Sequence, residues 1–161
     1  MPWFKKSSED PATPTPDEPP DPAGRAEVEA LRDDEVDWVR ATVAALGEQD
    51  VRAGDIDDLG RHYDELLTGW LRLREADRPD PDTVINQIGL AFGQYVADRT
   101  GLSWGVVTDP HGVTIVLHRP DRAGQVLLHP TTMVAERWQE HETRILPALA
   151  RATIVSVGTI A

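Results

Sequence analysis

Residues 101–118 of the 161-residue chain read GLSWGVVTDPHGVTIVLH, and this stretch decides the fold class. Apolar side chains occupy alternate positions on both sides of TDPHG, at Trp104, Val106, Val113, Ile115 and Leu117. Alternation with a period of two is typical of half-buried strands, and an Asp-Pro pair closed by a glycine two residues later is typical of a turn. The stretch therefore predicts an antiparallel hairpin.

The segments around the hairpin complete the expected fold. QVLLHP (125–130) predicts a third strand after the turn RPDRAG. Apolar spacings of three and four residues predict helices that begin near Ala26, near Asp57 and at Asp80-Pro81, the last ending at a left-handed cap on Gly101. A closing helix is expected from residue 131 or 132 through Trp138, a last turn or helix from residue 147 through 152, and the form of the tail 153–161 is left open. The expected fold class is α+β, with N-terminal helices followed by a three-stranded antiparallel meander covered by a C-terminal helix.

The domain organisation follows from composition. Residues 1–25 are rich in proline and acids and hold no large apolar residue after Trp3 and Phe4, so we expect a disordered leader. Residues 26–161 are expected to form one domain, with a helical part (26–100) and a meander with its closing helix (101–161). Trp3 and Phe4 are either incidental or a weak peripheral contact for a membrane surface or a partner.

Charge and residue usage exclude several classes of function. The formal net charge is −12, and residues 26–100 carry 18 acids against 8 bases while residues 101–161 carry 5 of each. Such a surface repels nucleic acid, so no nucleic-acid partner is expected. The absence of cysteine excludes disulfides, thiol catalysis and cysteine-bound metals. No apolar run is long enough for a membrane span, and the first residues lack the apolar core of a secretory signal, so a cytoplasmic location is expected.

The segment Gly101–Gly105 matches G-x-S-x-G, the turn that presents a catalytic serine in α/β-hydrolases. That turn needs a strand before the serine and a helix after it, whereas Ser103 is expected after a helix and before a strand. We therefore disfavour a serine hydrolase and predict no catalytic residue here.

The histidines and paired acids predict neither a metal site nor a cofactor. The five histidines lack the spacings of metal ligands, and His111 beside Asp109 is too small a set. The pairs Asp33-Asp34 and Asp57-Asp58 precede helical segments, where acids stabilise the helix N-terminus. No glycine-rich phosphate loop occurs.

From Ile88 to Trp138 the chain resembles an uncharacterised bacterial family, domain of unknown function 3806. The resemblance is carried by glycines and aromatic residues on the third helix and the hairpin and by the closing helix: Gly89, Ala91, Phe92, Gly93, Gly101, Leu102, Trp104, Asp109, Gly112, Pro130, Met133, Val134, Arg137 and Trp138. The helix with Trp38 is also similar to the family's lead-in. The resemblance implies a small α+β domain and no catalytic residue, and caps, turns and packing account for the motif residues.

The expected function is that of a non-enzymatic cytoplasmic protein-binding module of the adaptor, chaperone-like or immunity type. A meander backed by helices leaves a sheet face or edge for another protein. The alternative is a small ligand-binding enzyme of unassigned reaction, with polar residues such as Asn86, Gln87, Gln94 and Tyr95 in its site. A pocket with converging titratable groups would favour the enzyme.

Overall fold

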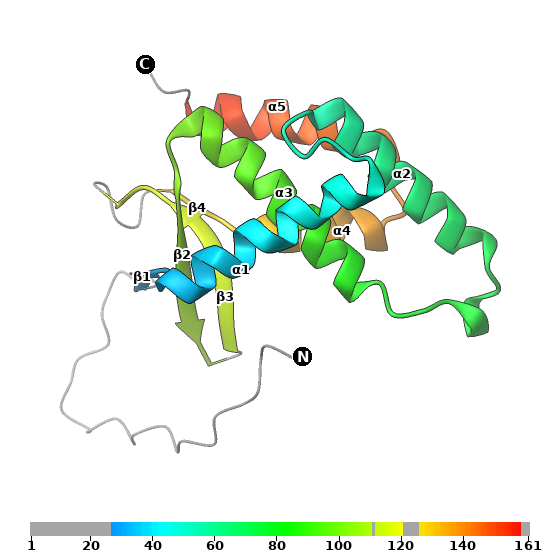
Figure 1. Cartoon of the computed structure of the whole chain (residues 1–161), viewed down its shortest axis with the longest axis horizontal. Helices are drawn as coiled ribbons and strands as arrows, with labels where there is room; N and C mark the ends of the chain where they lie inside the picture. Colours follow the sequence, from blue (N-terminus) through cyan, green and yellow to red (C-terminus); the bar gives the residue numbers. More distant parts are fainter. Residues whose placement is uncertain (1–26, 111, 121–125, 159–161) are drawn as a thin grey trace.

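The computed structural model describes residues 27–110, 112–120 and 126–158 of the chain (Figure 1). Leu31 and Arg32 lead from the first strand into the first helix. In chain order the elements are β1 (Val28–Ala30), α1 (Asp33–Ala44), the 3-10 helix η1 (Ala45–Gln49), α2 (Ile56–Arg72), the 3-10 helix η2 (Glu75–Asp77), α3 (Asp82–Thr100), β2 (Ser103–Asp109), β3 (Gly112–His118), β4 (Leu127–Leu128), α4 (Pro130–Gln139) and α5 (Leu146–Val157). The mixed α+β class is confirmed.

The sheet has four antiparallel strands in the order β1-β2-β3-β4, one more than the three expected. β2 and β3 form the predicted hairpin, with Asp109 opposite Gly112 at the turn. The additional strand, β1, lies where a helix was expected, and it pairs Val28 with Val107 and Ala30 with Gly105. Its three residues alternate apolar and acidic side chains, which suits a short edge strand but is too brief to stand out from a helical pattern.

The helices begin and end at residues whose side chains or backbone suit those ends. Asp55 precedes α2 and accepts hydrogen bonds from the N–H groups of residues 57 and 58 at 3.0 and 3.2 Å. Asp80 accepts one from the N–H of Asp82 at 2.9 Å, at the start of α3. Gly101 ends α3 with a φ of 72°, the left-handed conformation predicted for it. The first helix does not stop at Gly47 but tightens into η1, which includes that glycine.

The helix α3 is central and packs against α1, α2, α4 and α5 (Figure 1). α1 crosses the sheet, where Val39 joins Leu90 of α3 and Ile115 of β3 in one buried cluster. The helix expected to cover the meander, α4, packs mainly along α3 and meets the sheet at β3. The last helix, α5, reaches Val157, well beyond the expected end at residue 152, and packs on α2 and α3. Among the described residues, no helix combines the length and the apolarity that crossing a bilayer requires.

Candidate functional site

The glycines of the family motif lie where α3 meets α4 and β2. A Cβ on Gly89 would lie within 2.9 Å of the Thr131 side chain, and one on Gly93 would collide with the Trp104 indole and lie 2.9 Å from Pro130. These two positions let α4 and the Trp104 ring approach the α3 backbone. At the hairpin turn, Gly112 has a φ of 133°, which favours glycine.

The two motif tryptophans lie in different surroundings, both bordering one large core. Trp104 is half-buried, and its Nε1 donates to Oε1 of Gln94 at 3.0 Å. Trp138 is 3% exposed and contacts Tyr63 and Trp70 edge-on, with ring centroids 5.8 and 5.6 Å apart. Its Nε1 is buried and has no hydrogen-bond partner among the described residues. Trp138 therefore belongs to an aromatic cluster between α2 and α4.

The serine of Gly101–Gly105 is exposed at the first residue of β2, with α3 before it and the strand after it. This order is the reverse of the hydrolase turn. The histidines do not converge: His62 is buried on α2, His118 ends β3 and His141 follows α4, while His111 lies outside the described residues. In the described part of the chain, no three His, Asp or Glu residues are grouped in a way that could hold a metal ion.

An open hollow of about 730 Å³ borders the aromatic cluster, at the loop between α2 and α3. The Trp70 indole is held there by a hydrogen bond of 2.8 Å from its Nε1 to the carbonyl of Pro79, and the Arg78 guanidinium stacks 4.7 Å from its ring centroid. Arg78 also donates to the carbonyls of residues 71 and 73 at the end of α2. The hollow is lined by Trp70, Glu75, Arg78, Pro79, Asp80, Pro81 and His141.

His141 enters the hollow from the C-terminal end of α4. Its φ is 55°, and its N–H donates to the carbonyl of Trp138 while the N–H of Glu142 donates to Arg137, both at 3.0 Å. This is the left-handed helix ending in which glycine is usual. A hydrogen bond with Glu140 and partial burial raise the pKa of Glu142, which lies 3.9 Å from the Nε of Arg137. Titratable groups therefore gather beside the hollow, although Arg78 serves the backbone.

A free strand edge is the second candidate site. Counted from the pair that closes the two-residue hairpin turn, Val113, Ile115 and Leu117 direct their backbone N–H and C=O groups away from β2. Leu117 pairs with Leu128 of β4, which is only two residues long. Among the described residues, no strand pairs with Val113 or Ile115 on that side. The Val113 side chain is 42% exposed at the end of this edge.

Sequence reasoning missed both candidate sites, for different reasons. The hollow joins Trp70 to His141 across about seventy positions, a distance over which no local pattern acts. The β3 edge depends on the brevity of β4, because QVLLHP (125–130) predicted a strand long enough to cover it. The proline after Leu128 and His129 was the available signal, since proline donates no ladder hydrogen bond.

The comparison with protein families gives one match. The model described as a domain of unknown function (DUF3806) matches residues 65–146, just over half of the chain, and the chain belongs to this family. The family prediction is thereby confirmed. The match includes the hollow and the β2–β3 hairpin, whereas α1 with Trp38 and most of α5 lie outside it. No curated protein and no solved structure matches the chain.

Proposed function

We propose that this chain is a non-enzymatic cytoplasmic protein-binding module, of the adaptor, chaperone-like or immunity type, that receives an extended segment of its partner along the free edge of β3. The observation that carries the proposal is the pairing of β4 with Leu117 and His118 alone. Two residues farther back along β3, at Val113 and Ile115, backbone groups remain for a partner strand.

The chemistry of this edge suits strand addition. Unpaired N–H and C=O groups of an edge strand supply affinity for an extended segment, and side chains beside it supply selectivity. Natural proteins protect such edges with charges or proline. Residues 112–117 of β3, GVTIVL, contain neither. The exposed Val113 adds an apolar contact.

The polar residues of the enzyme alternative have structural partners. Gln87 donates to the carbonyl of Thr42 at 3.2 Å and so joins α3 to α1. Gln94 holds Trp104 and Asp98, and Tyr95 stacks under the guanidinium of Arg99 at 3.4 Å. These contacts favour a binding module over an enzyme that uses these residues.

The test combines crosslinking with two substitutions at one position. A photo-crosslinking residue at Val113, compared with one at Val155, which is 75% exposed on α5, should trap a partner only at Val113 in the native host. Val113→Pro removes an outward N–H without touching the β2 ladder, so the variant should fold and lose the trapped partner. Val113→Thr keeps the N–H and should retain it. Equal trapping at Val113 and Val155, or binding that survives Val113→Pro in a folded variant, would contradict the proposal.

Binding of a small ligand is a second candidate, favoured by the hollow beside Trp70. Four ionisable side chains line it, Glu75, Arg78, Asp80 and His141. Residues held in rare backbone conformations cluster at ligand sites, and His141 is one of them. A compound that raises the melting temperature of the wild-type protein but not that of His141→Ala would support this function. Equal shifts in both proteins would place the compound elsewhere.

A further inference from the structure

We infer that the partner segment on β3 is basic, with lysine or arginine at every second position on the side that faces α1. This inference rests on the proposed function, because it concerns the same edge. It follows from the position of α1 and from the charges that this helix presents beside the strand.

The geometry fixes which side chains of an added strand would face α1. Ile115 points toward α1, since it joins Val39 and Leu90 in a buried cluster. Val113 lies two positions away and therefore on the same face of the sheet. In an added antiparallel strand, the residues opposite Val113 and Ile115 lie on this face too. Alternate side chains of the partner would thus lie along the α1 side of the edge.

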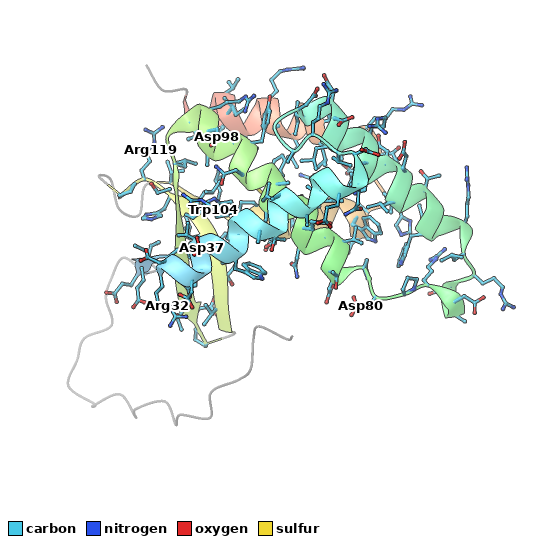
Figure 2. The ribbon with its side chains drawn as sticks, in the orientation of Figure 1. Arg32, Asp37, Asp80, Asp98, Trp104 and Arg119 are labelled. Carbon is cyan, nitrogen blue, oxygen red and sulfur yellow. The ribbon has the colours of Figure 1, made fainter. Side chains whose placement is uncertain are left out.

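The charges on that side are negative and available. Asp33 and Asp37 on α1 are exposed, and neither forms an ion pair within the described part of the chain. Arg32 is already engaged, at 3.5 Å from Asp34 and 3.3 Å from Glu35. Figure 2 shows Asp37 and Arg32 on the part of α1 that lies at the sheet. The two free carboxylates lie within two helical turns of Val39, the residue through which α1 contacts β3.

Lysine and arginine suit both the apolar and the charged features of this edge. Their aliphatic stems can cover the exposed Val113 and the half-buried Trp38, while their charged heads reach the carboxylates of α1. The net charge of −12 favours the approach of a basic segment over an acidic one. It also disfavours a second copy of this chain as the occupant.

The experiment uses the full chain and two capped peptides, alternating Thr-Lys and alternating Thr-Glu, eight residues each. Backbone amide shifts of Val113 and Ile115 should move with the lysine peptide, and the apparent affinity should fall as salt is added. Asp33→Asn with Asp37→Asn should weaken the lysine peptide roughly fivefold, the scale of one or two exposed charge pairs. The matched control, Glu48→Gln with Glu75→Gln, removes the same charge from exposed sites away from this edge and should leave the affinity within about twofold.

The outcomes separate this inference from the proposed function. Equal binding of both peptides at β3, independent of salt, would overturn the basic partner while leaving strand addition intact. Binding of the lysine peptide without shifts at Val113 and Ile115 would overturn both. A concentration-dependent dimer with the same two amides shifted would identify a second copy as the occupant and overturn the inference.

Discussion

At the scale of single residues, the close approach of α4 and β2 to α3 depends on the absence of a side chain at Gly89 and Gly93. Glycine inside a helix costs about 1 kcal/mol relative to alanine. That cost is offset because the indole of Trp104 and the ring of Pro130 occupy the space that a Cβ would take at Gly93. The family motif is therefore explained by packing at these positions.

Gly93→Ala tests this account against a matched glycine in another helix. The added methyl should force Trp104 and Pro130 apart, and overpacking of this kind costs about 1–3 kcal/mol, more than the gain in helix propensity. Gly69→Ala in α2 meets nothing within 4 Å and should raise the free energy of unfolding by about 0.5–1 kcal/mol. Chemical denaturation measures both. Stabilisation by Gly93→Ala would show that the junction is loose.

His141→Gly is expected to stabilise the fold. The residue ends α4 with a φ of 55°, which glycine adopts at lower cost than histidine. The gain should be about 0.5–1 kcal/mol in the free energy of unfolding, reduced by any lost contact with Trp70, whose ring centroid lies 6.5 Å away. A loss of stability in the denaturation midpoint would mean that the imidazole contacts outweigh the backbone cost. Gain of stability with loss of a hollow ligand would indicate that histidine is kept for binding.

At the scale of elements, the contact of α2 with α4 depends on three aromatic rings. Trp138 lies between Tyr63 and Trp70, and the hydroxyl of Tyr63 donates to the carbonyl of Glu142 at 3.0 Å. This bond ties the loop after α4 to α2. Burial also raises the pKa of Tyr63, so its phenol remains a donor.

Trp138→Ala should remove about 3–5 kcal/mol from the free energy of unfolding, the usual cost of deleting a buried large aromatic side chain. In a small domain this leaves little net stability, so any loss of partner binding would be indirect. Trp104→Ala should cost less, because its ring is half-buried and bonded to Gln94. Denaturation and binding are to be measured on the same variants. A stable Trp138→Ala variant that no longer binds would make this residue a contact.

The elements that sequence patterns predicted are those whose ends carry strong local signals. Asp55, Asp80 and Gly101 hold helix ends, and the turn at residues 109–112 sets the hairpin. β1 escaped because a three-residue strand owes its existence to its pairing with β2 rather than to its own pattern. The extent of α5 and the place of α4 were likewise set by packing on α3, which depends on residues far apart in the chain. For the same reason neither candidate site could be located in advance.

At the scale of the whole molecule, two buried ionisable groups on α2 link stability to pH. Asp58 accepts a hydrogen bond of 2.8 Å from the N–H of Arg52 and is paired with Arg61, so its carboxylate holds the loop before α2 to the helix. His62 is 8% exposed, and its Nε2 has no partner among the described residues. Burial lowers the pKa of His62 below its usual 6.5.

Acid should therefore destabilise the protein in two stages. Below pH 6.5 the unfolded chain protonates His62 more readily than the folded chain does, so stability begins to fall. The backbone N–H of Arg52 and then the Arg61 guanidinium lower the pKa of Asp58 from 3.8 to about 2. Its contribution is complete above pH 3.8 and is lost as the pH falls through 2.

Asp58→Asn isolates the second stage. Without the carboxylate, the free energy of unfolding should be lower at neutral pH and should depend less on pH between about 4 and 2, because the unfolded chain no longer takes up that proton preferentially. Asp57→Asn is the control, since this neighbouring acid is exposed and its side chain accepts no hydrogen bond from the described residues. Denaturation midpoints measured across this pH range decide the matter. If Asp58→Asn keeps the wild-type slope, the acid response comes from other carboxylates, and the link between Asp58 and the loop before α2 contributes little to the stability of the fold.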